Sequence, residues 1–357
     1  MRLQLHVGTE KTGSSYLQTL CGKNRQFLQE NGLWFPDAGK YEKQMQQGTV
    51  SPGNGLELGE HIRRNSWAGV TNWIAERVNE AQRRKCKSLL LSYELLFAEM
   101  SNEGAVDQFQ SAASEAGIGE ISCLLMIRDP IDQVLSLYKH RAKNGRVDDI
   151  EEWIKEGYSL PRQLDDFLGQ VDRSSIQIHV RKYTKDTASL IDVFFHDWLG
   201  VNDPPIKFQS YLNPSLSLSE LAVIRHVVAT RPDDQRAFYS KFFALPRDEK
   251  ADEKDIETAT AAKVEDYLCR FDKVWKLLDD RLRKDGGIEV PQLRHDSVEG
   301  ACHYSFSEAQ IQAWSEAHTQ SATIRYAAGT LIHRLGIGKL VRTIMSRFRN
   351  GLRNLLG

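Results

Sequence analysis

Four short, apolar, β-prone runs alternate with helical patterns in the first part of the chain. They are Arg2–Val7, Lys87–Glu94, Glu120–Pro130 and Ser175–Tyr183. Strands that are apolar along their whole length are typical of a parallel sheet covered by helices on both faces. The sequence therefore predicts an α/β fold with three layers and a central parallel sheet.

The remainder of the chain has a different pattern. From about Ser217 to Arg283 it is almost wholly helical, and it includes a charge run, Arg247–Glu257, that fits a solvated helix face or loop. At 357 residues the chain is long enough for one large domain or two ordinary ones. We expect an α/β core at 1–210, a mainly helical extension of the same domain at 211–328 and a basic amphipathic tail at 329–357.

The stretch HVGTEKTGSS, His6–Ser15, connects the end of the first strand to a helix expected from Ser14 to about Glu30. Gly8 and Gly13 have the spacing of the nucleotide loop G-x-x-x-x-G-K-[ST], but the lysine, Lys11, lies inside the loop. A helix N-terminus offers unpaired N–H groups and a partial positive charge to an anion. The pattern predicts a phosphate-binding loop in a P-loop-like fold, with Lys40–Gly55 as a loop over the site.

A second group of polar residues begins where the third strand ends. In RDPIDQVLSLY, Arg128 stands at the carboxyl end of the strand and Pro130 opens a helix that carries Ser136. An ion pair of the arginine with Asp129 or Asp132 is the structural alternative. Because neighbouring parallel strands end at one edge of a sheet, the guanidinium and the hydroxyl could instead bind a second phosphate of the same ligand.

These two stretches resemble the nucleotide-binding signatures of the sulfotransferase superfamily, and its bacterial carbohydrate-type members in particular, over roughly Leu3 to Leu199. Those enzymes use 3′-phosphoadenosine 5′-phosphosulfate (PAPS) as sulfuryl donor, and in their 5′-phosphosulfate loop the lysine precedes the glycine, as in KTGSS. The resemblance implies that the 5′ end is held by Lys11, Thr12, Gly13, Ser14 and Ser15, and the 3′-phosphate by Arg128 and Ser136. Tyr183, which ends the fourth strand, is a candidate for lining the nucleotide or the acceptor.

The activity that the resemblance implies is transfer of a sulfuryl group to a hydroxyl acceptor, of a carbohydrate or glycolipid. Lys11 would neutralise the charge that develops on the leaving phosphate, and the scheme requires no metal. The general base stays open between two residues. Glu94 ends the second strand and should project into the same crevice, whereas His61 needs little pKa tuning to accept a proton near neutrality.

Charge and composition bear on the location of the protein. The formal net charge of −1 gives no general attraction to nucleic acid. Five scattered cysteines without C-x-x-C spacing fit a reducing compartment. No stretch approaches the ~18 apolar residues of a membrane span. We expect a cytoplasmic protein with a small-molecule or glycan acceptor and no nucleic-acid partner.

The tail at 329–357 combines a basic face with an apolar stripe. Such a helix could lie on the inner face of an anionic membrane, and packing on the domain or on a partner subunit is the alternative. Two other functions also fit part of the pattern. One is a P-loop kinase or another NTP-dependent enzyme, although it lacks the lysine after Gly13. The other is a non-catalytic nucleotide-binding module attached to the membrane through the tail.

Overall fold

The computed structural model describes residues 1–48, 51–142, 148–202, 204–205, 216–230, 235–292 and 304–320, so the predicted tail at 329–357 lies outside the described residues. The chain divides into two compact units. The first comprises Met1–Gln133, Gly157–Tyr211 and Leu268–Gln292, and the second comprises Val134–Glu156, Leu212–Tyr267 and Leu293–Gly357. Residues 268–292, which lie within the segment 211–328 expected to form the helical extension, thus belong to the first unit.

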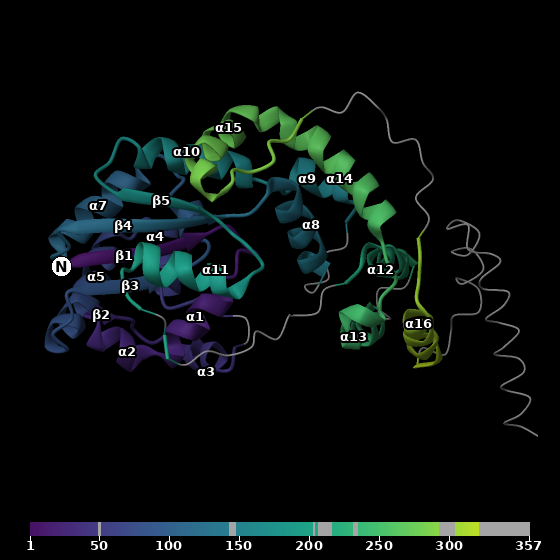
Figure 1. Ribbon diagram of the computed structural model, residues 1–357, viewed down its shortest axis with the longest axis horizontal. Helices are drawn as coiled ribbons and strands as arrows, with labels where there is room; N and C mark the ends of the chain where they lie inside the picture. Colours follow the sequence, from purple (N-terminus) through teal and green to yellow (C-terminus); the bar gives the residue numbers. More distant parts are fainter. Residues whose placement is uncertain are drawn as a thin grey trace, which may run out of the picture. The chain divides into compact units, whose positions relative to one another are not determined.

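The first unit is built on a five-stranded sheet with the order β2-β3-β1-β4-β5, in which all neighbours are parallel (Figure 1). The strands are β1 (Arg2–Gly8), β2 (Leu33–Trp34), β3 (Ser88–Ser92), β4 (Glu120–Ile127) and β5 (Gln177–Lys182). This confirms the predicted three-layer α/β fold and its four main strands. The two-residue β2 was not predicted, because it is too short to show a periodicity.

Helices cover both faces of this sheet (Figure 1). The helices of the first unit are α1 (Ser14–Lys23), α2 (Arg25–Glu30), η1 (Gly39–Tyr41), α3 (Glu42–Gln46), α4 (Leu56–Arg63), α5 (Trp67–Arg83), α6 (Leu96–Glu99), α7 (Ala105–Glu115), α10 (Leu160–Val171), α11 (Thr187–Ile191), the π-helix η3 (Asp192–Trp198), η6 (Cys269–Phe271), α15 (Asp272–Leu282) and η7 (Arg283–Asp285). Helix α8 (Pro130–Arg141) crosses the division between the units. The single helix expected over 14–30 is broken at Asn24, which leaves the helical region (φ −111°, ψ 27°) and donates its side-chain amide to Leu20 O at 2.8 Å.

One face of the sheet buries polar side chains among apolar ones. Strand register places four of them together, and all are buried: Gln4, His6, Ser92 and Ser122. The apolar residues around them belong to the cluster that packs against α1, α11 and η3. The His6 ring meets Phe194 edge-on at 5.2 Å between centroids, and the Trp198 indole donates to Ser122 Oγ at 3.0 Å. Two residues of η3 thus contact the polar part of this face.

The second unit contains the helices α9 (Ile150–Glu156), α12 (Leu218–Thr230), α13 (Gln235–Ala244), η5 (Arg247–Glu249), α14 (Lys254–Leu268) and α16 (Glu308–Gln320). The predicted helical character of this region is confirmed, but the charge run is not simply solvated. Glu253 is buried and accepts from Leu218 N and Ser219 N, at 2.7 Å each, at the start of α12. Lys250 pairs with the buried Glu220 at 2.8 Å. Two charges of the run are therefore structural.

Part of the stretch expected to be a loop over the site forms η1 and α3, and its end packs on β3. Asn54 Oδ1 accepts from Ser92 N at 2.8 Å, and Gly55 N donates to Ser92 O at 3.2 Å. Gly53 has φ 89°, and a Cβ there would lie 2.2 Å from Ser92 O. Glycine is required at 53 for the backbone angle and for space.

We expect Gly53→Ala to lower the free energy of unfolding by about 2–5 kcal/mol, because left-handed strain and a backbone clash add together. Gly286→Ala is the matched control, since Gly286 has φ 86° and no heavy atom lies within 4 Å of the position that its Cβ would take. It should lose only the strain of about 1–2 kcal/mol. Urea denaturation followed by circular dichroism measures both, and equal losses would contradict the close approach.

Candidate functional site

The loop between β1 and α1 combines two left-handed residues with a free helix start. Lys11 has a φ of 69°. Gly13, which directly precedes the first residue of α1, has a φ of 81°. The first helical hydrogen bonds run from Tyr16 N and Leu17 N to Gly13 O, and no side chain caps this end of α1. N–H groups of a first helical turn have no intrahelical acceptor, so the loop offers donors to an anion.

The hydroxyls of this loop face its interior. A Cβ placed on Gly8 would lie 2.8 Å from Thr12 Oγ1 and 3.3 Å from Ser14 Oγ. Thr12 donates to Thr9 O at 2.6 Å, whereas the buried Ser14 hydroxyl makes no hydrogen bond among the residues that the structure describes. Leaving such a group unpaired costs about 1–3 kcal/mol, which a bound anion would recover. Ser15, the second residue of α1, is half-buried.

Lys11 lies among three charged groups from the loop and from the ends of two neighbouring strands. Burial lowers the pKa of Lys11, and Arg128 lowers it further, while Glu94 and Glu10 raise it. Since β3 and β4 both pair with β1, the turn with Glu94 and the exit with Arg128 emerge at the edge where the loop lies. The structure thus brings Lys11, Glu94 and Arg128 into one electrostatic cluster.

Glu94 lies in the turn after β3. Burial raises the pKa of its carboxyl to about 7, against partial opposition from the Ser14 hydroxyl. That hydroxyl is close enough to act on the carboxylate, although its geometry falls short of a hydrogen bond. Glu10 raises the pKa of Glu94 as well, and Lys11 lowers it. A carboxyl that is half protonated near neutrality can both accept and give a proton.

Arg128 is largely buried, with its side chain 13% exposed, and it pairs with Asp132 at 3.2 Å. The ion pair that the sequence left open is therefore present, but within the described residues its hydrogen bond uses one of five guanidinium donors. The guanidinium also lies over the Tyr183 ring, 5.8 Å from its centroid. A Cβ on Gly13 would meet Tyr183 Cε2 at 3.0 Å, so the tyrosine connects the arginine to the loop.

Two predicted site residues have other surroundings. Ser136 is half-buried on α8 and belongs to the second unit, so only the Arg128 half of the predicted 3′-phosphate motif falls in the first unit. His61 lies on α4, where its Nδ1 would be 2.5 Å from a Cβ on Gly69 and its carbonyl accepts from Ser66 N at 2.9 Å. Those contacts put His61 at the turn between α4 and α5. Of the two candidate bases, Glu94 is the one beside Lys11.

His6 was not predicted to take part in the site. Its Nδ1 lies 2.8 Å from Ser92 Oγ, and Gln18 Nε2 donates to the same oxygen at 3.2 Å. Burial lowers the pKa of His6 to about 3, so the ring is neutral around pH 7. The available signal was the alternation in RLQLHV, which places His6 on the same strand face as Gln4.

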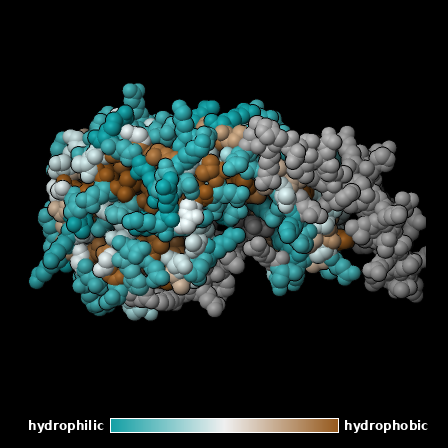
Figure 2. All heavy atoms as spheres, turned by 45° about the horizontal axis from the view of Figure 1, so that its top comes forward, coloured by the Kyte–Doolittle hydropathy of each residue, from teal (hydrophilic) through white to brown (hydrophobic). Residues whose placement is uncertain are grey.

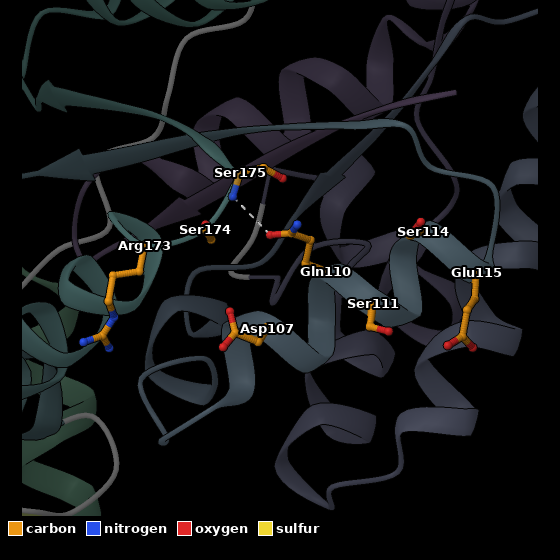
Figure 3. A pocket seen from close by; sticks show the side chains of 8 residues that line it. All are labelled: Asp107, Gln110, Ser111, Ser114, Glu115, Arg173, Ser174 and Ser175. Atoms are coloured by element: carbon orange, nitrogen blue, oxygen red, sulfur yellow. Dashed lines mark hydrogen bonds between the residues drawn. The ribbon is translucent and has the colours of Figure 1, made fainter.

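A polar hollow of about 540 Å³ lies elsewhere on the first unit, between α7 and the segment before β5 (Figure 3). Its lining includes Asp107, Gln110, Arg173 and Ser175, and Gln110 Oε1 accepts from Ser175 N at 3.2 Å. Because Arg173 and Ser175 lie in the short segment before the first residue of β5, Gln177, this hollow adjoins the amino end of that strand. The loop lies at the carboxyl ends, so the hollow is separate from the candidate site.

On the face in Figure 2, hydrophobic residues form small groups between hydrophilic ones. Leu95, next to Glu94, is the only large hydrophobic side chain that is well exposed in the described ranges, at 40%. Among those same residues we find no helix that is both long and apolar enough to cross a membrane, and no cluster of three or more His, Cys, Asp or Glu suited to a metal ion.

A scan against known protein families, a search of curated proteins and a search of solved structures found no match to this chain. The site is therefore defined by its own geometry. An uncapped helix start, a buried hydroxyl and a lysine lie in one loop, and Arg128 and Glu94 stand at the ends of the adjoining strands. This arrangement suits an anionic ligand and a proton transfer beside it.

We expect the stability of the protein to fall as the pH drops from about 6.5 toward 3, because unfolded chains then bind a proton that the buried His6 ring does not. His6→Gln should remove about 2–4 kcal/mol of this pH dependence. Glu94 has the opposite effect on the pH dependence, since the stability linked to its raised pKa falls as the pH rises from 4.5 to about 7. His6→Gln leaves Glu94 in place, so this contribution is the same in the variant and in the wild type. Urea denaturation across this pH range measures the difference.

His196→Gln serves as the control for this experiment, because His196 is exposed and pairs with Asp192 at 3.0 Å outside the sheet. We expect its acid profile to match that of the wild type. If His6→Gln also follows the wild-type profile, burial of the imidazole is not what makes the fold sensitive to acid.

Proposed function

We propose that this protein is a sulfotransferase that moves a sulfuryl group from PAPS to a hydroxyl acceptor of the carbohydrate or glycolipid class. The observation that carries the proposal is that Arg128 acts electrostatically on Lys11. The two residues follow neighbouring parallel strands, β4 and β1, which end at the same edge of the sheet. Two cationic groups in this arrangement suit a ligand with two separate phosphate groups. A single nucleotide phosphate would need only the loop.

In this proposal the loop holds the 5′-phosphosulfate. The N–H groups at the start of α1 and the Ser14 hydroxyl would bind its oxygens, and Lys11 would stand near the bridging oxygen. Sulfuryl transfer resembles phosphoryl transfer, with an in-line, loose transition state in which negative charge gathers on the leaving phosphate. A cation in a partly buried site stabilises that charge more than it would in water. Arg128 would bind the 3′-phosphate.

Glu94 is the residue that we propose as general base. The acceptor oxygen forms a bond to sulfur while the bond from sulfur to the leaving phosphate oxygen breaks, and the proton of the acceptor hydroxyl passes to the carboxylate. A pKa of about 7 suits this role, because an efficient base has a pKa near the operating pH. The position of Glu94 beside Lys11 would put the base and the leaving-group cation at one reacting centre.

We further propose a cytoplasmic location, with peripheral contact of the segment 329–357 with the inner face of a membrane. This part of the proposal rests on the sequence alone, because that segment lies outside the described residues. Its basic and apolar residues would favour an anionic bilayer surface. Such contact would suit a glycolipid acceptor.

Calorimetry with adenosine 3′,5′-bisphosphate in the absence of magnesium tests the donor site. We expect micromolar binding to the wild type, and a loss of about tenfold or more in Lys11→Ala and in Arg128→Ala, because each removes a charged hydrogen-bond donor. Adenosine 5′-monophosphate should bind more weakly to the wild type, and Arg128→Ala should reduce that difference.

Arg2→Ala is the matched arginine control, since Arg2 pairs with Glu120 at 2.8 Å at the amino ends of β1 and β4. It should leave the affinity unchanged. Equal affinity for the two nucleotides would contradict the donor assignment, and a strict requirement for magnesium would favour the NTP-dependent enzyme instead.

A further inference from the structure

The backbone on both sides of Glu94 is held in place. Tyr93 N donates to His6 O at 3.1 Å, and Leu96 N donates to Tyr93 O at 3.2 Å. The Tyr93 ring lies against α4, because a Cβ on Gly59 would be 2.2 Å from its Cε1. These contacts fix the turn that carries Glu94 against β1 and α4.

The charges of the loop nearly cancel without a ligand. Lys11 and Arg128 supply two positive charges, and Glu10 and Glu94 supply two negative ones when both are ionised. Arg128 has a further counter-charge in Asp132, at 3.2 Å. A phosphate or sulfate in the loop would add one or two negative charges beside two carboxylates, which is unfavourable in a partly buried site.

The charged groups of α4 and α6 do not offset the excess of negative charge that a bound anion would create. Glu60, Arg63 and Glu99 act on the Tyr93 hydroxyl, and Arg63 is paired with Glu99 at 3.0 Å. Acting directly on Glu94 are Glu10, Lys11 and the Ser14 hydroxyl. The imidazole of His6, below the loop, stays neutral because burial lowers its pKa to about 3.

The place for the anion is marked by two independent features. The start of α1 is uncapped, and the buried Ser14 hydroxyl has no hydrogen-bond partner in the described part of the chain. That same hydroxyl is close enough to Glu94 to lower the pKa of the carboxyl. An anion that binds Ser14 and the helix start would therefore lie next to the Glu94 carboxyl.

We infer that an anion enters this loop together with a proton, which Glu94 takes up. The protonated carboxyl becomes a hydrogen-bond donor to the anion, whereas the carboxylate would repel it. Glu94 is already close to half protonated at neutral pH, because burial raises its pKa to about 7. This role deepens the proposed function, on which it rests only in requiring an anion in the loop.

The linkage makes affinity depend on pH. Above the pKa of Glu94 in the free site, binding of an anion requires uptake of a proton from solution. Because the proton concentration falls as the pH rises, the affinity for the anion falls by up to about tenfold per pH unit. In the proposed sulfotransferase the proton must leave Glu94 again before the carboxylate can act as base. Donor binding and acceptor activation would then have opposite pH dependences.

Calorimetry of adenosine 3′,5′-bisphosphate binding from pH 6.5 to 9, in two buffers of different ionisation enthalpy, counts the protons taken up. On binding, the wild type should take up more protons than Glu94→Gln. The variant corrects for protons taken up by the phosphates of the nucleotide, because these titrate in both proteins. At pH 8.5 Glu94→Gln should bind adenosine 3′,5′-bisphosphate at least about tenfold more tightly than the wild type does. Glu10→Gln is a second variant, in which proton uptake should begin at a lower pH than in the wild type because the substitution lowers the pKa of Glu94.

Glu99→Gln is the matched control, because burial raises the pKa of this carboxyl too, but Glu99 is paired with Arg63. It should take up as many protons as the wild type. Equal proton counts in wild type and Glu94→Gln, or weaker binding by Glu94→Gln at pH 8.5, would overturn the inference.

Inorganic sulfate, which stays dianionic over this pH range, separates the inference from the proposed function. Sulfate binding with proton uptake, without nucleotide binding, would remove the sulfotransferase proposal and support the inference. Nucleotide binding without the Glu94-dependent proton would do the reverse. Binding of neither anion would overturn both.

Discussion

The parallel register of β1 with its two neighbours is the constraint on which the candidate site depends. His6 is aligned with Ser92 of β3, and Gly8 is aligned with Met126 of β4. All three strands therefore end within a few residues of one another. The loop that follows Gly8, the turn that carries Glu94 and the strand exit at Arg128 consequently lie at one edge, as is general for ligand sites of open parallel sheets. A shift of β3 or β4 by two residues would keep the core faces but separate these groups.

Beneath this edge, the sheet buries polar groups where apolar ones would be more favourable. Burying a polar group without a partner costs about 1–3 kcal/mol, and His6 Nε2 and Gln18 Oε1 lack partners among the described residues. Their other atoms meet at Ser92 Oγ, next to the turn that carries Glu94. The network thus ties β1, α1 and β3 together at the point where the loop begins. The network therefore positions that turn, at a cost in stability.

Local patterns in the sequence predict the elements better than the contacts between them. The four apolar strands and the glycine loop were predictable because their signals lie within a few residues of each other. The break at Asn24 was not, because a side-chain bond to Leu20 O replaces the expected continuation of the helix. The π-helix η3 and the polar network around Ser92 also depend on residues far apart in the chain. The sequence predicted Glu94 in the crevice at the strand ends, and the strand register brings it to Lys11. The contact of His61 with Gly69 depends on the packing of α4 on α5, which the sequence does not reveal.

The balance of charge in the loop connects folding to binding. Arg128 disfavours the charged form of Lys11, whereas Glu94 and Glu10 favour it in this partly buried place. The empty loop is thereby close to neutral, so its attraction for an anion comes from oriented N–H groups and the Ser14 hydroxyl more than from net charge. Such short-range donors stabilise an anion that is seated in the loop and contribute little binding energy to an anion that is only nearby. The same carboxylates that permit two cations at one sheet edge therefore also decide which protonation state can accept the ligand.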